Sequence, residues 1–129
     1  MIVLDTHVVL WLAYEPELLS QAASEAIRQA RREDGLAVPD KCLWELAMLV
    51  SRGQVKVRTS LRDFLQEVER NCSVLPITSA IAERAVLFSD RYPSDPTDRL
   101  IGATAVAHGL KLVTKDRKIR ASGEVDCVW

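Results

Sequence analysis

Short apolar segments alternate with longer segments of helical periodicity along this chain of 129 residues. Each apolar segment is only a few residues long, which is typical of strands that are buried on both faces of a sheet. Parallel strands need a crossover connection, usually a helix, so the alternation favours an α/β fold with a short, mostly parallel central sheet. We expect strands at residues 2–4, 36–39, 74–77 and 110–113, and a short fifth strand at 125–128.

The segments between the strands carry the start and stop signals of helices. Ser20 and Ser79 stand where N-caps are expected, and Asp40 is the expected cap of the helix that follows it. Asp95 is a further expected N-cap, with Pro96 as the first helical residue. The predicted helices span residues 7–13, 21–32, 43–51, 61–70, 80–89 and 96–108.

Composition limits the class of protein. Hydrophobic residues make up 48% and charged residues 27% of the chain, the balance of an ordinary globular domain, and we expect one domain over 1–129. A net charge of −1 excludes a nucleic-acid binder that works by basic excess alone. Three cysteines lack the spacing of zinc or redox motifs, and no signal peptide or membrane span is recognisable. We therefore expect a cytoplasmic protein with reduced thiols.

Two carboxylates follow predicted strands directly. Asp5 comes after the strand at 2–4, and Asp116 follows Leu112-Val113 through Thr114-Lys115. In open α/β sheets, ligands bind at the carboxyl ends of the strands. If these two strands are neighbours, both acids face one crevice.

Two more acids stand in strongly apolar helices. Every residue of 42–50 except Glu45 is apolar, and a helix of that kind is normally buried on all sides. Asp98 stands at the start of a helix rich in small apolar residues, which lets the helix pack closely against the sheet. An ionised carboxylate in such surroundings is costly unless it is paired or bound to a cation.

Each acid also has a structural interpretation. Asp5 can begin a turn, Asp116 can be a loop acid, and Asp98 can be a helix N3 residue favoured by the dipole. Glu45 can lie on a narrow solvated stripe or pair with a buried arginine. The coincidence of the four favours a shared site, and clustered carboxylates without thiolates or imidazoles suit Mg²⁺ or Mn²⁺. Such ions typically serve phosphoryl-transfer chemistry.

Four segments together resemble the PIN domain, and within it the VapC-type ribonuclease toxins of type II toxin–antitoxin pairs. Their order and spacing match the family, and the resemblance covers essentially the whole chain. Two departures stand out: Asp40-Lys41-Cys42 replaces a serine-rich turn before the Glu45 helix, and Gly102 stands where alanine is frequent. The matching segments are MIVLDTH at 1–7, LWELAML at 43–49, DPTDRLIGATA at 95–105 and LVTKD at 112–116.

The resemblance implies a three-layer α/β/α sandwich and a Mg²⁺- or Mn²⁺-dependent endoribonuclease that forms a homodimer and is inhibited by a small antitoxin. It implies that Asp5, Asp98 and Asp116 are metal ligands. Glu45 completes the catalytic set, as a ligand or as the group that orients the attacking water. Thr6 and Thr114 match positions that support the acids.

Other residues have weaker expected roles. Basic side chains beside Asp116 are expected to contact RNA phosphates, and a second basic cluster spans 52–62. His7 is expected to orient Asp5, and Arg99 to form a structural ion pair. Trp11 and Trp44 are interpreted as core or interface residues. The expected RNA-binding residues are Lys115, Arg117 and Lys118, in a basic cluster that also contains Lys111 and Arg120.

The sequence is also compatible with two other functions. A phosphoacceptor receiver domain also places a carboxylate Mg²⁺ pocket at strand ends, although Thr6-His7 occupies the place of its paired acids. A PIN module without catalytic activity, binding RNA or a protein, is the second alternative. No serine-hydrolase elbow and no glycine-rich phosphate loop is present.

Overall fold

Five short strands form one parallel sheet in the computed structural model, which describes residues 1–129. The strand order is β3-β2-β1-β4-β5, so β1 is central and lies between β2 and β4. All four neighbouring pairs are parallel, which confirms the predicted α/β class. The strands are β1 (Ile2–Leu4), β2 (Leu36–Pro39), β3 (Cys72–Leu75), β4 (Leu112–Val113) and β5 (Cys127–Val128).

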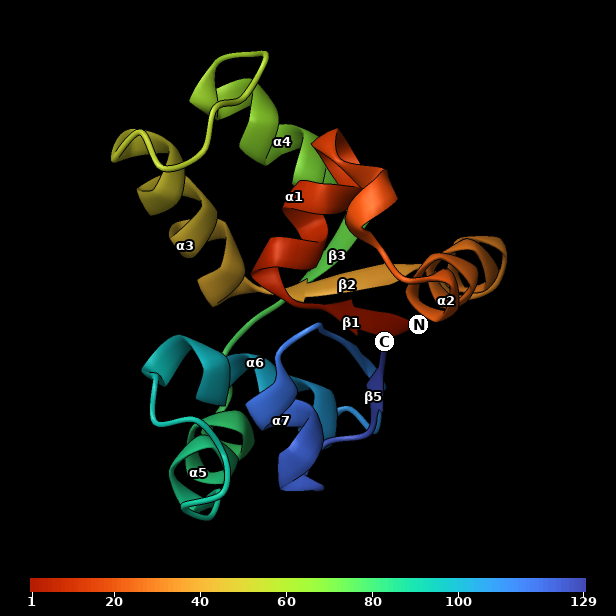
Figure 1. The fold of residues 1–129 in the computed structure, drawn as a ribbon. Coiled ribbons are helices and arrows are strands. Elements are labelled where there is room, and N and C mark those ends of the chain that lie inside the picture. The colour runs from red at the N-terminus through yellow and green to blue at the C-terminus, as the bar shows by residue number, and fades with distance from the viewer.

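Helices cover both faces of the sheet and produce three layers (Figure 1). The first four helices pack on one face and the last three on the other. No helix has the length and apolarity that crossing a membrane requires. The helices are α1 (Thr6–Tyr14), α2 (Gln21–Arg32), α3 (Asp40–Ser51), α4 (Leu61–Asn71), α5 (Ser79–Leu87), α6 (Pro96–Ala107) and α7 (Arg117–Ser122), with a 3₁₀ turn at Pro16–Leu18.

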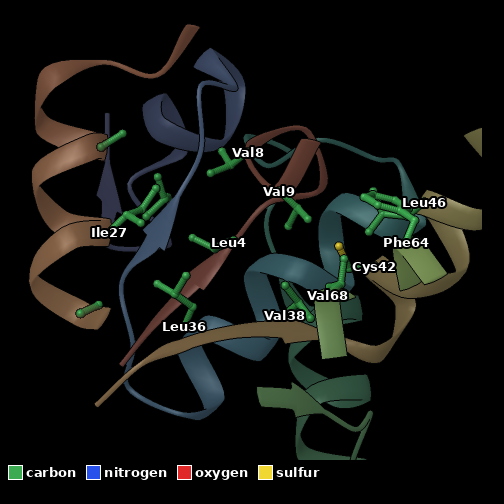
Figure 2. Packing of buried hydrophobic residues seen from close by; sticks show 13 residues of the cluster. Leu4, Val8, Val9, Ile27, Leu36, Val38, Cys42, Leu46, Phe64 and Val68 are labelled. Atoms are coloured by element: carbon green, nitrogen blue, oxygen red, sulfur yellow. The ribbon is translucent and has the colours of Figure 1, made fainter. Parts of the chain in front are cut away.

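The central strands supply both halves of the core. Val3 belongs to the cluster under α5, α6 and α7, whereas Leu4 belongs to the cluster under α1 to α4. Leu112 and Val113 of β4 divide in the same way. Figure 2 shows the cluster under α1 to α4, which contains Leu4. Side chains of a strand alternate between faces, so a strand with helices on both sides is apolar at every position.

The strand order reverses at the centre of the sheet. The chain runs outward from β1 through β2 to β3, then returns across the sheet to β4 on the other side of β1. A reversal of this kind leaves a crevice at the carboxyl ends of the two strands, where α/β proteins bind ligands. Leu4 pairs with Val113, so Asp5 and Thr114 leave the sheet as neighbours.

Helix α3 differs from its prediction. It begins at Asp40 with Pro39 at the N-cap, and the Asp40 carboxylate instead accepts a hydrogen bond from the Ile77 amide at 3.1 Å. The expectation that α3 is buried on all sides is wrong, because only Cys42 and Leu46 are buried and Trp44 is 54% exposed. The sheet and the neighbouring helices α1, α4 and α6 cover only part of its surface.

Other helix and strand boundaries also differ from those predicted. The strand predicted at 74–77 lies at 72–75, since Pro76 has no amide hydrogen for the ladder. Thr78, not Ser79, caps α5 by accepting from the Ile81 amide. The short helix α7 was not predicted at all, and Asp116 is its N-cap residue. The predicted caps Ser20 and Asp95 are confirmed.

Candidate active site

Asp5 is held rigidly at the end of β1. Its side chain is nearly inaccessible to solvent, with 4% of the residue exposed. Oδ1 accepts a hydrogen bond from the Thr6 amide at 2.7 Å, and Oδ2 accepts one from the Thr114 hydroxyl at 2.6 Å. Each oxygen keeps a lone pair for a further ligand. The Thr6 amide and the Thr114 hydroxyl therefore fix the orientation of Asp5.

Thr114 also connects Asp5 to Asp116. The fully buried Thr114 hydroxyl donates to Asp5 and accepts a hydrogen bond from the Asp116 amide at 3.0 Å. Asp116 in turn caps α7, because its Oδ1 accepts from the amides of Lys118 at 2.8 Å and Ile119 at 3.0 Å. Its Oδ2 has no hydrogen-bond partner. The hydroxyl of Thr6, by contrast, donates to the Cys42 sulfur at 3.5 Å and does not contact an acid.

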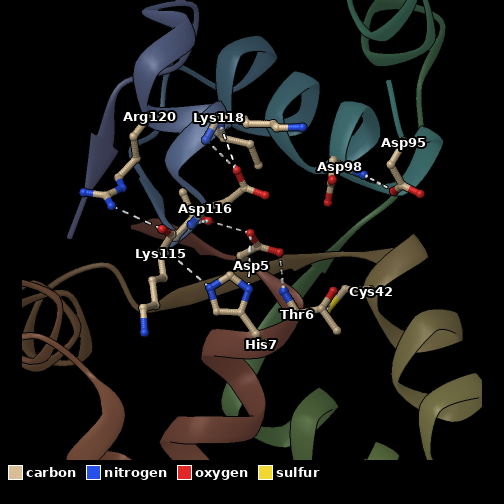
Figure 3. Close-up of polar contacts among 12 residues, drawn as sticks. Asp5, Thr6, His7, Cys42, Asp95, Asp98, Lys115, Asp116, Lys118 and Arg120 are labelled. Atoms are coloured by element: carbon tan, nitrogen blue, oxygen red, sulfur yellow. Dashed lines mark hydrogen bonds and ion pairs between the residues drawn. The ribbon is translucent and has the colours of Figure 1, made fainter. Parts of the chain in front are cut away.

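His7 bridges the two strand ends. Its Nε2 accepts a hydrogen bond from the Lys115 amide at 3.1 Å, and its Nδ1 lies 3.6 Å from Oδ2 of Asp5 (Figure 3). Because Nε2 is the acceptor, the proton of the neutral ring is on Nδ1 and faces Asp5. The position of His7 agrees with the predicted orienting role.

Asp98 reaches the same region from α6. The N-cap Asp95 accepts a hydrogen bond from the Asp98 amide at 3.0 Å, so Asp98 is the N3 residue of the helix. Its half-buried carboxylate accepts no hydrogen bond. Burial, and to a smaller extent the charges of Asp5, Asp95, Asp116 and Glu45, together raise the pKa of Asp98 to about 7. In Figure 3 the carboxylates of Asp5, Asp98 and Asp116 face a common space.

One cavity contains all four predicted acids. It has a volume of about 420 Å³, and α3 contributes Glu45 to its wall. Its apolar side was not predicted, because that prediction rested on charged side chains; it consists of the four hydrophobic residues Leu10, Trp44, Met48 and Leu49. Trp44 is thus neither a core residue nor buried in this chain. The complete lining is Asp5, Thr6, His7, Leu10, Trp44, Glu45, Met48, Leu49, Arg52, Asp98 and Asp116.

The oxygen ligands that this cavity offers fit a hard divalent cation. No hydrogen-bond donor within the protein reaches the carboxylates of Asp98 and Glu45 or Oδ2 of Asp116. Burial and, after it, repulsion from the neighbouring carboxylates raise the pKa of Asp98. A bound Mg²⁺ or Mn²⁺ would relieve this repulsion with its preferred oxygen ligands. The side-chain conformations do not form a closed coordination sphere, since no three His, Cys, Asp or Glu side chains are close enough to hold an ion together.

Basic residues border the acidic cavity. Arg117 and Lys118 line a second hollow that shares Asp98 and Asp116 with the first. Lys115 is exposed, and its ammonium lies 5.4 Å from the centre of the Trp11 ring. Arg52, from the second predicted cluster, lines the acidic cavity itself.

Arg99 does not form the predicted ion pair with an acid. Its guanidinium donates to four backbone carbonyls around the end of α5. These carbonyls include the unpaired acceptors that every helix leaves at its C-terminus. Arg99 therefore ties the start of α6, next to Asp98, to the end of α5. The acceptors and distances are Ala85 at 3.0 Å, Phe88 at 3.2 Å, Ser89 at 3.4 Å and Pro93 at 3.0 Å.

The pKa of Asp98 predicts how the metal-free protein responds to pH. A carboxyl with a raised folded-state pKa contributes stability that is complete below its ordinary pKa of 3.8 and is lost as pH rises through about 7. We expect Asp98→Asn to remove this loss, so that the variant melts at a higher temperature than the wild type at pH 8 in EDTA, with a smaller difference at pH 5. Thermal unfolding across this range measures the effect.

A matched control separates this effect from a general change in charge. Asp90 is exposed and lies outside the cavity, so Asp90→Asn should leave the pH profile of the wild type unchanged. Equal melting temperatures of the Asp98→Asn variant and the wild type at pH 8 would show that Asp98 is not under electrostatic strain.

Comparison with known proteins identifies the class to which this fold and site belong. The model of the PIN domain family matches residues 2–124. The chain therefore belongs to the PIN domain family. Among its relatives is ribonuclease VapC22 of Mycobacterium tuberculosis (strain ATCC 25618 / H37Rv), which is 41% identical over 120 residues, or 93% of this chain and 90% of the relative. The resemblance to VapC-type members is thus confirmed.

Solved structures share the fold. The complex VapBC2 from Rickettsia felis, bound to a promoter DNA fragment, contains a chain with a TM-score of 0.76 and 16% identity, covering 98% of this chain and 97% of that chain. A chain of VapBC-1 from nontypeable Haemophilus influenzae has a TM-score of 0.69 and 18% identity, with coverages of 98% and 96%. The three-layer PIN-like sandwich is therefore confirmed, and the phosphoacceptor alternative is replaced by the family assignment.

Proposed function

We propose that this protein is a Mg²⁺- or Mn²⁺-dependent endoribonuclease and the toxin of a type II toxin–antitoxin pair. The observation that carries the proposal is one cavity that is lined by four carboxylates from separate parts of the chain. The homology to a VapC ribonuclease supports RNA as the substrate.

Asp5, Asp98 and Asp116 would hold the metal ion, and Glu45 would be a further ligand or orient the attacking water. When bound, such an ion stabilises negative charge on the phosphate and the leaving oxygen and lowers the pKa of a water. The chain's own contribution is positioning. The Thr6 amide and the Thr114 hydroxyl hold Asp5 in one orientation, and the α7 amides hold Asp116 by Oδ1, which leaves Oδ2 available to an ion.

RNA would approach along the basic border of the cavity. Arg117 and Lys118 share a hollow with two of the acids, which suits contacts to phosphates that flank the cleaved bond. Lys115 is a further exposed cation, adjacent to Asp116 in sequence, and Arg52 lies in the cavity wall. These cations compensate the acidic cluster, which would otherwise repel the substrate.

An antitoxin and a second copy of the chain are the proposed partners. The similar chains in Rickettsia felis and Haemophilus influenzae were solved as VapBC pairs. The exposed apolar part of α3, with Trp44 at 54% exposure, is a surface that a protein partner would cover. A short reading frame immediately upstream of the gene, encoding a DNA-binding N-terminal segment, would support the antitoxin.

Metal removal tests the proposed activity. We expect the purified protein to cleave RNA in Mg²⁺ or Mn²⁺, and the products to fall to background in EDTA, because Asp5, Asp98 and Asp116 then lack the cation that offsets their charge. Gel analysis of total RNA and sequencing of the new ends measure cleavage and identify the target. Cleavage that persists in EDTA would contradict the metal-dependent mechanism. Folded protein that cleaves no RNA under any condition would favour the catalytically silent PIN module.

A further inference from the structure

We propose that Tyr92 is a positioning residue that sets the place of Asp98, and that Gly102 is glycine because the Tyr92 hydroxyl occupies the space of a side chain there. Neither residue is part of the acidic cavity wall. The inference rests on the proposed function in that Asp98 is taken as a metal ligand.

The Tyr92 hydroxyl is bonded directly to the backbone of Asp98. It donates to the Asp98 carbonyl at 2.6 Å, and only 2% of the tyrosine is exposed. The ring is stacked on Phe88 with centroids 4.1 Å apart and an interplanar angle of 8°. Phe88 in turn contributes a carbonyl to the Arg99 guanidinium. Packing thus leaves the tyrosine ring little freedom, and its hydroxyl fixes the first turn of α6.

Gly102 makes this contact possible. A Cβ at position 102 would lie 2.1 Å from the Tyr92 hydroxyl oxygen and 2.8 Å from the ring carbon that bears it. Glycine in the interior of a helix costs about 1 kcal/mol relative to alanine. The approach of the tyrosine explains a glycine in the middle of α6, since the three atoms nearest to the position of a Cβ all belong to Tyr92.

The contact acts on the metal site through the position of one ligand. Asp98 is the only one of the four acids on α6, and its carboxylate has no hydrogen bond of its own to orient it. Its place relative to Asp5 therefore depends on how the first turn of α6 is anchored. Hydrogen-bonded partners that orient metal ligands are typically worth about 10- to 100-fold in metal affinity or activity.

Tyr92→Phe tests the role of the hydroxyl alone, because it keeps the ring and its stacking on Phe88. We expect the variant to remain folded and to bind Mn²⁺ about tenfold more weakly in calorimetric titration. RNA cleavage should require a correspondingly higher Mn²⁺ concentration, with the KM for RNA unchanged. Tyr14→Phe is the matched control: it removes a hydroxyl that accepts only from the Arg58 amide, outside the cavity, and should leave Mn²⁺ binding as in the wild type.

Gly102→Ala tests the second half of the proposal. The added methyl group must displace the tyrosine hydroxyl, so this variant should lose stability and also bind Mn²⁺ more weakly. In the Tyr92→Phe background the oxygen at 2.1 Å is gone, and the nearest ring atom is at 2.8 Å. We therefore expect the alanine to destabilise the double variant less than it destabilises the wild type, a non-additivity that urea denaturation measures.

The outcomes separate the positioning role from a merely structural one. If Tyr92→Phe lowers stability but leaves the Mn²⁺ affinity unchanged, the positioning role of Tyr92 is overturned. If the effects of Tyr92→Phe and Gly102→Ala on stability are additive, the explanation of Gly102 is overturned. A wild-type protein that binds no Mn²⁺ and cleaves no RNA would instead overturn the proposed function. Weaker Mn²⁺ binding in Tyr92→Phe but not in Tyr14→Phe supports the inference.

Discussion

Asp5→Asn should lower RNA cleavage by more than about 100-fold, because partners one step removed from a metal already contribute about 10- to 100-fold and Asp5 is a direct ligand in the proposed mechanism. The substitution removes the charge with little change in shape. An asparagine carbonyl can still accept from the Thr6 amide, and its amide group can donate to the Thr114 hydroxyl, so both contacts are kept, the second with its donor and acceptor exchanged. Initial rates on an RNA substrate in saturating Mg²⁺ measure the loss.

Stability must be measured beside activity. We expect Asp5→Asn to melt at or above the temperature of the wild type in EDTA, since it removes one of the charges that strain Asp98. The exposed variant Asp90→Asn should retain full activity. An Asp5→Asn protein with wild-type cleavage would remove Asp5 from the catalytic set, whereas an unfolded variant would show that Asp5 is primarily structural.

Arg99→Ala should cost about 3 kcal/mol or more of unfolding free energy, the largest stability effect that we expect from a single polar side chain here. The guanidinium donates to four carbonyls, and hydrogen bonds to charged groups contribute about 1.5–3 kcal/mol each, part of which water replaces after the substitution. It also places a positive charge at the negative end of the α5 dipole. Urea denaturation measures the change.

Two further variants show whether geometry or charge is responsible. Arg99→Lys keeps the charge, but an ammonium cannot span four carbonyls, so it should recover only a small part of the loss. Arg28 is a suitable control because it is exposed and pairs only with Glu25 at 2.9 Å, so Arg28→Ala should change stability by less than about 0.5 kcal/mol. If Arg99→Ala were no worse than Arg28→Ala, the carbonyl contacts would be energetically unimportant.

Local signals predicted most of the elements and all four acids of the cavity. The short apolar strands, the caps Ser20 and Asp95, and the acids after β1 and β4 are recognisable because periodicity and capping involve residues close together in sequence. The adjacency of β1 and β4 could only be assumed. The hydrogen bond from Thr114 to Asp5 joins residues 109 positions apart, and no local pattern reports such a contact.

Side-chain contacts with the backbone could not be predicted from the sequence, for a different reason. Arg99 binds carbonyls and Tyr92 donates to the carbonyl of Asp98, and every residue has a carbonyl, so neither partner leaves a mark in the sequence. The short helix α7 escaped prediction because its six residues contain too few turns for a periodic pattern. The partial exposure of α3 likewise depends on which neighbours pack against it, not on its own composition.

The order of residues along the chain is thus sufficient to place negative side chains at the ends of strands and on two helices, because strand burial and helix capping are local properties. Their convergence on one cavity depends on tertiary structure: β4 returns to the side of β1, and Arg99 and Tyr92 hold the start of α6 by hydrogen bonds to backbone carbonyls. Those contacts form between segments far apart in sequence. Only the folded chain brings the side chains within the few ångströms at which hydrogen bonds form and a metal ion is coordinated.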